Sequence, residues 1–242
     1  PFISYSHGVC MGGGLGLVAG ASHRVVSDGA RIAMPEIHIG LFPDVGGGFF
    51  LNRVPGGAGR LLALTGATIN EADALFAGLA DAFVPLEMKE AFVEALLALP
   101  FTGQAVADHE LVSRLVLSQL RRYHPGLPES NLRMYFDAIR FTCAMPTVIG
   151  LRDALQAAAG ADPWFRPLAD NLANGSPTTA HVAFEYLRRC RPLSLAEVLA
   201  LDGILARNFQ REHDFPEGVR ALLIDKDRKP AWSPDRFEAV DP

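Results

Sequence analysis

Apolar runs of strand length alternate with glycine turns in the first part of the chain. Phe2–Ser6 is a short β-prone run, and the glycines 12–14 then open a segment of small residues, 15–21, of helical length. Residues 23–27 predict a second strand, and residues 31–34 begin another extended segment. A strand, a glycine turn, a helix and a strand in succession indicate α/β layers.

Apolar residues at helical spacing dominate the rest of the chain. This spacing predicts a helix over 56–64 and another over 86–99, with one strand, 79–84, between them. Almost every segment after Pro85 is predicted to be helical.

Capping residues mark three further helix starts. Asn70 with Asp73 precedes an apolar run, and Ser176 precedes a proline that suits the first helical position. Ser194 and Glu197 form a capping box, in which the hydroxyl and the carboxylate each accept a hydrogen bond from a free backbone amide.

Composition narrows the class of protein. The 242 residues are 49% hydrophobic and 20% charged, which suits one large globular domain or a domain with an appended helical part. The net charge is −5 and the basic residues are scattered, so no nucleic-acid partner is expected. Three cysteines at distant spacings, without a CxxC, argue against a disulfide framework or a zinc site and favour a reducing compartment.

The first 23 residues carry no Asp, Glu, Lys or Arg and could be mistaken for a signal peptide or a membrane span, but they have no basic n-region. Six glycines between Gly8 and Gly20, and two histidines, oppose both interpretations, so no membrane segment is expected here. The chain begins in a predicted strand without an initiator Met. We therefore expect its natural amino terminus to lie upstream of Pro1.

The glycine run 12–14 is the first candidate for chemistry. Glycines let backbone amides approach a ligand closely, and a helix that starts there adds a partial positive charge that can stabilise an oxyanion. Tight packing of the helix on a strand is the alternative. A dinucleotide fingerprint also fits at Gly14–Ala19, but Asp28 follows Gly14 by 14 residues, where about 20 is usual.

Two carboxylates, Glu36 and Asp44, lie among apolar residues, prolines and glycines. Burial would raise their pKa values and suit them to proton transfer near neutrality. The alternative is structural: Glu36 would cap a turn, and Asp44 would cap a helix that begins at Val45.

Other catalytic motifs are missing from the sequence, including G-x-S-x-G, the P-loop and H-E-x-x-H. Cys10 beside the glycine turn has no evident histidine partner and is interpreted as a small core residue. His7, His23 and His38 are interpreted as hydrogen-bonded structural histidines.

Taken together, these segments resemble the crotonase (enoyl-CoA hydratase/isomerase) superfamily. The resemblance rests on His7-Gly8, glycines 12–14, Pro35-Glu36 with 39–41, Gly46-Gly47 and residues 64–66. Within the superfamily the chain is most similar to the 3-hydroxyisobutyryl-CoA hydrolases, through segments 11–14, 33–36, 40–48, 213–221, 223–227 and 230–232. The resemblance is weakest between residues 99 and 172.

The resemblance implies an α/β fold: a crotonase-like ββα spiral, its N-terminal turns missing here, followed by an α-helical C-terminal region. Residues 1–99 would form the end of the spiral core. Residues 100–242 would form the helical region, with helices of the CoA site and of oligomerisation, which makes a homo-oligomer possible. Gly13 would supply one oxyanion amide and the other would come from upstream of Pro1, so this chain alone is expected to be inactive.

The implied activity is hydrolysis of a short 3-hydroxyacyl-CoA thioester, with 3-hydroxyisobutyryl-CoA from valine breakdown as the expected substrate. Hydratases of the superfamily use two glutamates, and Gly16 stands at the position of the first, which disfavours hydration. Glu36 would activate water or attack the carbonyl itself. Asp44, where hydratases usually have glycine, would orient the substrate hydroxyl or assist proton transfer to the thiol.

Substrate would also be bound by Gly12 and, in the charged tail, by Lys226 and Lys229, for which a solvated charge cluster is the alternative. No metal or redox cofactor is expected, because CoA is part of the substrate. A hydratase or isomerase acting on another acyl-CoA, a silent CoA- or RNA-binding homologue, and an NAD-binding protein remain as alternatives. The expected location is the cytoplasm in a bacterium and the mitochondrial matrix in a eukaryote.

Overall fold

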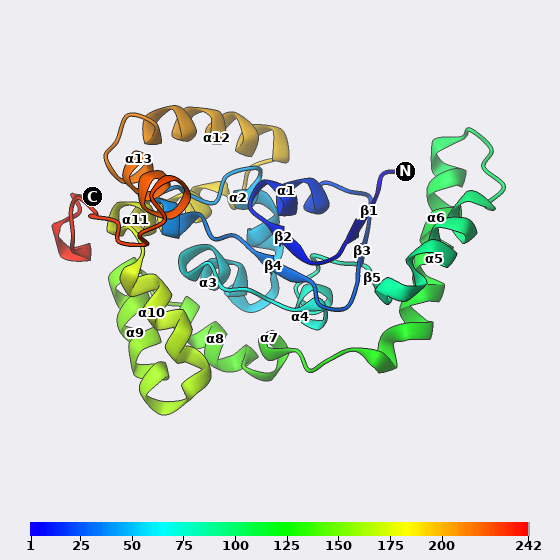
Figure 1. Ribbon diagram of the computed structural model, residues 1–242, viewed down its shortest axis with the longest axis horizontal. Coiled ribbons are helices and arrows are strands. Elements are labelled where there is room, and N and C mark those ends of the chain that lie inside the picture. The colour runs from blue at the N-terminus through cyan, green and yellow to red at the C-terminus, as the bar shows by residue number, and fades with distance from the viewer. Residues whose placement is uncertain (242) are drawn as a thin grey trace. The chain divides into compact units, whose positions relative to one another are not determined.

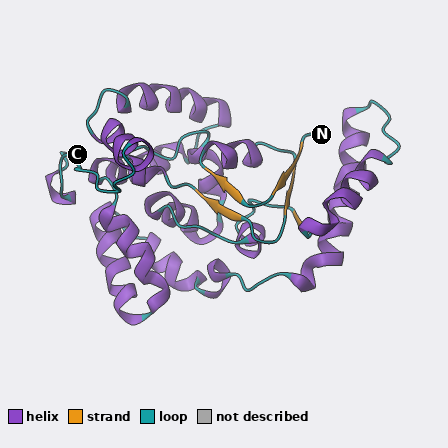
Figure 2. Ribbon diagram, in the orientation of Figure 1, coloured by secondary structure: helices purple, strands orange, loops and turns teal. Residues whose placement is uncertain are grey.

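The computed structural model describes residues 1–241 and divides into two compact units. The first unit holds residues 1–32 and 69–134, and the second holds 33–68 and 135–242. Strands are short and helices predominate (Figure 2). The first unit contains β1 (Ile3–Ser6), β2 (Val9–Met11), α1 (Gly13–Ala19), β3 (His23–Val26), α4 (Glu71–Phe76), β5 (Ala82–Phe83), α5 (Lys89–Leu97), α6 (Ala105–Tyr123) and α7 (Asn131–Met134). The second contains α2 (Gly47–Phe50), α3 (Ala58–Thr65), α8 (Phe136–Cys143), α9 (Val148–Ala161), α10 (Arg166–Asn174), α11 (Pro177–Cys190), α12 (Leu195–Phe209) and α13 (Asp214–Val219), while β4 (Arg31–Ala33) crosses the boundary.

A parallel sheet in the order β1-β3-β5 organises the first unit (Figure 1). Ile3 pairs with His23, and Val25 pairs with Ala82. Helix α6 covers this sheet, and Val112 and Val116 from α6 are buried against it together with Phe92 from α5. Burial of such side chains contributes roughly 1.5–3 kcal/mol each, so this cluster holds the unit together.

A capping box at the start of α4 also ties α7 to the first unit. The Asn70 side chain accepts a hydrogen bond from the Asp73 amide at 2.8 Å, and Asp73 reaches back to the Asn70 amide. The same Asp73 carboxylate accepts hydrogen bonds from the Ser130 hydroxyl and the Leu132 amide, both at 2.8 Å. One buried acid therefore satisfies the starts of two helices.

Helix α3 is the buried centre of the second unit, where it packs against α8, α10 and α11. A β-carbon on Gly59 would lie 1.8 Å from the Leu51 carbonyl oxygen, so only glycine allows α3 to start this close to the preceding turn. Leu61 and Leu64 of α3 are almost fully buried.

Helix α13 contacts the 3₁₀ helix Glu36–Ile39 backbone against backbone. A β-carbon on Gly218 would lie 2.4 Å from the Ile39 carbonyl, and one on Gly40 would lie 2.4 Å from the Asp214 carbonyl oxygen. Gly40 also has φ +68°, which disfavours other residues. Two glycines thus bring α13 onto the segment that carries Glu36.

The structure confirms the predicted starts at Asn70, Ser176 and Ser194, each with a side chain that caps the helix. The predicted strand over 79–84 shortens to Ala82–Phe83. Strand β2, which pairs with β4 just before the glycine turn, was not predicted from the sequence. The two compact units do not test the predicted division at residue 99, which stays a prediction.

Candidate active site

Glu36 is the first residue of the 3₁₀ helix 36–39, directly after Pro35. Glu36 is only 6% exposed, and its carboxyl oxygen Oε2 has no hydrogen-bond partner among residues 1–241. Burial, with a smaller contribution from the negative charge of Asp44, raises the pKa of Glu36 from 4.5 to about 7. A carboxyl group with this pKa can take up and release a proton at neutral pH.

The backbone around Glu36 is tightly held. The Leu41 amide donates to the Glu36 carbonyl at 3.0 Å, and the Ser176 amide at the start of α11 donates to the Ile37 carbonyl at 3.3 Å. Ile37 is fully buried. Pro35, not Glu36, occupies the N-cap position of the 3₁₀ helix, and no side chain caps it, so the interpretation of Glu36 as a cap is wrong.

Asp44 lies in the loop that leads to α2 and is partly buried. Burial raises the pKa of its carboxyl group, and the charge of Asp202 on α12 adds to the shift. Gly46 is the N-cap of α2 and no side chain caps this helix, so Asp44 is not the predicted cap. Its backbone carbonyl oxygen accepts a hydrogen bond from the Gly47 amide at 2.8 Å.

Glu36 and Asp44 belong to the same unit, and the negative charge of Asp44 contributes to the raised pKa of Glu36. Gly12 and Gly13 belong to the first unit. Gly12 has φ +52° and ends the turn, and Gly13 is exposed at the first position of α1. The first intrahelical hydrogen bond there runs from the Gly16 amide to the Gly12 carbonyl, so the earlier amides lie at the free end of the helix.

The other candidates from the sequence have structural environments. Cys10 is buried and its pKa is raised by burial, which confirms it as a core residue. His23 is buried between the hydroxyl groups of Ser22 and Ser113, as interpreted. His7 is exposed and no hydrogen bond joins it to another residue of the described range, so its structural interpretation is wrong.

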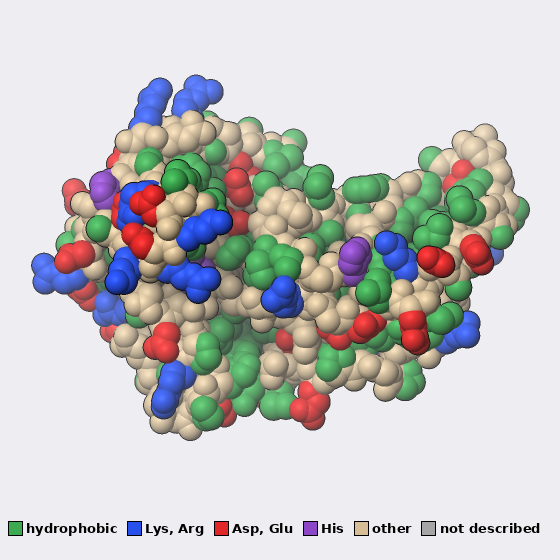
Figure 3. Space-filling view, viewed as in Figure 1, with side chains coloured by type: hydrophobic (Ala, Val, Ile, Leu, Met, Phe, Trp, Pro, Cys, Tyr) green, Lys and Arg blue, Asp and Glu red, His purple; other side chains and the backbone are tan. Residues whose placement is uncertain are grey.

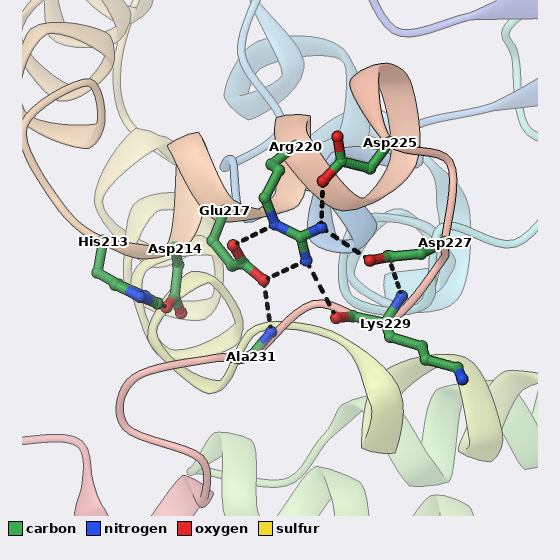
Figure 4. Close-up of polar contacts among 8 residues, drawn as sticks. All are labelled: His213, Asp214, Glu217, Arg220, Asp225, Asp227, Lys229 and Ala231. Carbon is green, nitrogen blue, oxygen red and sulfur yellow. Dashed lines mark hydrogen bonds and ion pairs between the residues drawn. The ribbon is translucent and has the colours of Figure 1, made fainter.

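Lys226 and Lys229 lie in the tail after α13. Arg220 organises this tail through the contacts drawn in Figure 4. Arg220 forms ion pairs with Glu217 at 2.8 Å, Asp225 at 2.7 Å and Asp227 at 2.8 Å. Arg220 also donates to the Lys229 carbonyl at 3.3 Å. The hydrogen bonds that Glu217 accepts from Arg220 and from the Ala231 amide hold its pKa down at about 2.

The side chains of Lys226 and Lys229 take no part in this network of ion pairs. Both are exposed, and within residues 1–241 neither ammonium group forms an ion pair, whereas the acids beside them are neutralised by Arg220. Lys and Arg side chains gather, among acidic ones, over the region of α13 and the tail (Figure 3). The tail thus offers unpaired cations to an anion in solution.

A family profile described as enoyl-CoA hydratase/isomerase matches residues 1–242. The chain belongs to this family. The crotonase resemblance drawn from the sequence is therefore confirmed.

Curated relatives are similar to this chain in sequence along almost its whole length. The chain is 36% identical over 240 residues to "3-hydroxyisobutyryl-CoA hydrolase, mitochondrial" of Xenopus laevis and likewise of Homo sapiens. In both cases the match covers 99% of this chain and 61% of the relative. The chain thus spans about three fifths of the length of these relatives.

Two solved structures of the family share the fold. A carnitinyl-CoA dehydratase from Mycobacterium thermoresistibile is 33% identical with a TM-score of 0.85, covering 100% of this chain and 65% of that one. An enoyl-CoA hydratase from Rhodobacter sphaeroides 2.4.1 is 35% identical with a TM-score of 0.83, covering 100% and 66%. The crotonase-like α/β fold is confirmed. No helix within residues 1–241 is long and apolar enough to cross a membrane.

Sequence reasoning missed two residues at this site, Tyr186 on α11 and Asp202 on α12. Both are buried and both hydrogen-bond to the backbone just after Asp44. The closely spaced glycines 46–48 were the one sign in the sequence that another segment packs closely here. In the structure that segment is α11: a β-carbon on Gly48 would lie 2.6 Å from Cys190 and 2.7 Å from Tyr186.

Proposed function

We propose that the full-length protein hydrolyses the thioester of a short 3-hydroxyacyl-CoA, with 3-hydroxyisobutyryl-CoA as substrate and 3-hydroxyisobutyrate and CoA as products. This reaction belongs to valine breakdown. The observation that carries the proposal is Glu36, a buried carboxyl group with an unpartnered oxygen and a pKa raised to about 7. The names of the curated relatives support the same reaction.

Gly16 supports hydrolysis over hydration. It lies inside α1, at the position where hydratases of the superfamily carry a second glutamate. Addition of water to a double bond uses two acid–base groups, one for the water and one for the carbon. With glycine there, Glu36 alone remains of that pair.

Glu36 begins the reaction in its ionised form. As a general base it removes a proton from water, and the resulting hydroxide attacks the thioester carbonyl. As a nucleophile it attacks the carbonyl itself and forms a mixed anhydride, which water then hydrolyses. On both routes the C–S bond breaks, the CoA thiolate departs, and a proton from the attacking water ends on sulfur. A burst of free CoA in the first turnover would assign the nucleophilic route.

The remaining residues assist this step. The Gly13 amide donates to the oxyanion that forms on the thioester oxygen, beside Gly12. Asp44, which is partly buried and has a raised pKa, orients the substrate hydroxyl or passes the proton to the departing CoA thiolate. Lys226 and Lys229 attract the phosphates of CoA. None of these steps requires a metal or a redox cofactor.

The test is release of free thiol by the full-length protein over a panel of short acyl-CoAs, with enoyl-CoA absorbance followed in parallel. We expect thiol release to be fastest with 3-hydroxyisobutyryl-CoA. The same assay on Glu36→Gln tests the role of Glu36. Its control is Glu71→Gln, the same change at a buried glutamate of the first unit. Efficient hydration of an enoyl-CoA without thiol release would instead assign a hydratase activity, as named for the relative from Rhodobacter sphaeroides.

A further inference from the structure

The loop that carries Asp44 is held from both sides by one tyrosine. Before Asp44, the fully buried ring of Phe42 packs edge-on against Tyr186, with ring centroids 5.2 Å apart. After Asp44, the Gly48 amide donates a hydrogen bond to the Tyr186 hydroxyl at 2.9 Å. Tyr186 on α11 therefore spans the whole loop from Phe42 to Gly48.

Asp202 on α12 completes this arrangement. Its Oδ2 accepts a hydrogen bond from the Gly46 amide at 2.8 Å, and its Oδ1 accepts one from the Tyr186 hydroxyl at 2.5 Å. Tyr186 is 2% exposed and Asp202 is 7% exposed. Both oxygens of a buried carboxylate are thus used to hold the backbone beyond Asp44, directly and through the tyrosine.

The backbone held in this way is one that a free loop would avoid. Val45, next to Asp44, has φ +50°, and Gly46 has φ +82°. A β-branched residue in the left-handed region costs free energy and persists only when its surroundings fix it. The hydrogen bonds to Gly46 and Gly48 are the polar contacts from α11 and α12 that do so.

We infer that Tyr186 and Asp202 are positioning residues, which fix the strained turn at Val45–Gly48 so that the Asp44 carboxyl group meets the substrate in one geometry. This inference rests on the proposed function. Neither residue needs to touch the substrate, since they act through the backbone on both sides of Asp44. Misplacement of a reacting group by about 1 Å can cost roughly 100-fold in rate, so loosening this turn should be visible in kcat.

Kinetics of Tyr186→Phe and Asp202→Asn test the inference. We expect kcat to fall roughly 10- to 100-fold while KM changes little, because binding contacts remain and geometry is lost. The matched controls are Tyr135→Phe and Asp162→Asn, which alter another tyrosine–aspartate hydrogen bond of the same unit, 3.4 Å long. These controls should leave kcat unchanged.

A double-mutant cycle with Asp44→Asn separates positioning from general damage. If Tyr186 acts through Asp44, Tyr186→Phe costs little further activity once Asp44→Asn is present. Losses that multiply in the double variant, or a change confined to KM, would overturn the inference.

A measurement without substrate keeps the inference apart from the proposed function. Hydrogen exchange at the Gly46 and Gly48 amides should be roughly fivefold or more faster in both variants than in the parent, because each loses a hydrogen-bond partner or its support. Unchanged exchange would overturn the positioning role even in a protein that hydrolyses the thioester. Faster exchange in a protein that releases no thiol would uphold the turn's dependence on Tyr186 and Asp202 and reject the hydrolase proposal alone.

Discussion

Asp73 of the first unit and Glu36 of the second are both buried acids at the start of a helix, but one carboxyl oxygen of Glu36 lacks a hydrogen-bond partner among residues 1–241. Asp73 is 3% exposed and binds the Ser130 hydroxyl and the Leu132 amide in addition to its capping box. Glu36 is 6% exposed, and its Oε2 has no partner among the described residues. The same functional group at the same depth is satisfied in one place and left unsatisfied in the other.

This contrast separates structural acids from chemical ones. A buried carboxylate that accepts several hydrogen bonds stabilises the fold, whereas one without them is costly to ionise and is retained for another reason. Burial alone does not make the distinction. The number of hydrogen-bond partners does make it, and it predicts opposite effects on stability when Glu36 or Asp73 is replaced.

The largest expected effect is on catalysis. Glu36→Gln in the full-length protein should reduce kcat for thiol release by roughly 100- to 10,000-fold, because it removes the charge and keeps the shape. The binding of CoA should be unchanged. Steady-state kinetics on the purified variant measures this, and Asp73→Asn, a paired acid, should retain kcat. Full activity in Glu36→Gln would break the comparison.

The two acids should also differ in the sign of their effect on stability. The pKa of Glu36 is about 7 in the folded state and 4.5 without burial, so stability falls as pH rises between these values. Glu36→Gln should therefore stabilise the fold by about 3 kcal/mol above pH 7 and not at all below pH 4.5. Asp73→Ala should destabilise it by roughly 1–3 kcal/mol through lost caps.

Urea denaturation at pH 4 and pH 8 measures both changes. A Glu36→Gln variant that is less stable than the parent at pH 8 would show that Glu36 supports the fold in a way that its missing partner does not suggest.

Asp44 sharpens the comparison, because it is partly buried and because burial, together with the charge of Asp202, raises its pKa. If it binds the substrate hydroxyl, Asp44→Asn should lower kcat/KM for the 3-hydroxyacyl-CoA about tenfold more than for the deoxy analogue, because a hydroxyl-binding site loses discrimination when its partner changes. Parallel assays on both substrates measure the ratio. Equal losses would remove Asp44 from recognition of the hydroxyl.

The smallest effect is expected for the exposed cations, where Arg220 is paired and Lys226 and Lys229 are not. Lys226→Ala and Lys229→Ala should each raise KM by roughly two- to fivefold without changing kcat, and added salt should shrink the difference. KM at two salt concentrations measures this. If KM stays constant even when Lys226 and Lys229 are both replaced by alanine, the two lysines are a solvated charge cluster and do not bind CoA.

Local chemistry made much of the fold predictable. The helix starts at Asn70 and Ser194 were predicted because a capping box is formed within four residues. Glu36 and Asp44 were predicted as site residues from their apolar surroundings and from the family motif. Strand β2 was missed because its three residues offer too short a run for alternation to show.

Long-range contacts were beyond the sequence. Asp202 is 156 residues from Gly46 and Tyr186 is 138 residues from Gly48, and each reads as an ordinary helical residue in its own segment. The unpartnered oxygen of Glu36 was equally hidden, because the absence of a partner depends on every segment that packs around it. The alternative of caps at Glu36 and Asp44 failed for the related reason that Pro35 and Gly46 already occupy the cap positions.

The contact between Gly40 and Asp214, and between Gly218 and Ile39, has a consequence for the tolerance of the gene to change. Neither glycine can gain a single carbon without meeting backbone, which cannot move aside as a side chain can. In a library of all substitutions sorted for folded protein, positions 40 and 218 should be among those that accept only glycine, although they lie far apart in the sequence. The contact of α13 with the segment around Glu36 therefore depends on the absence of a side chain at two positions. A homologue with a larger residue at either position would have to place α13 differently.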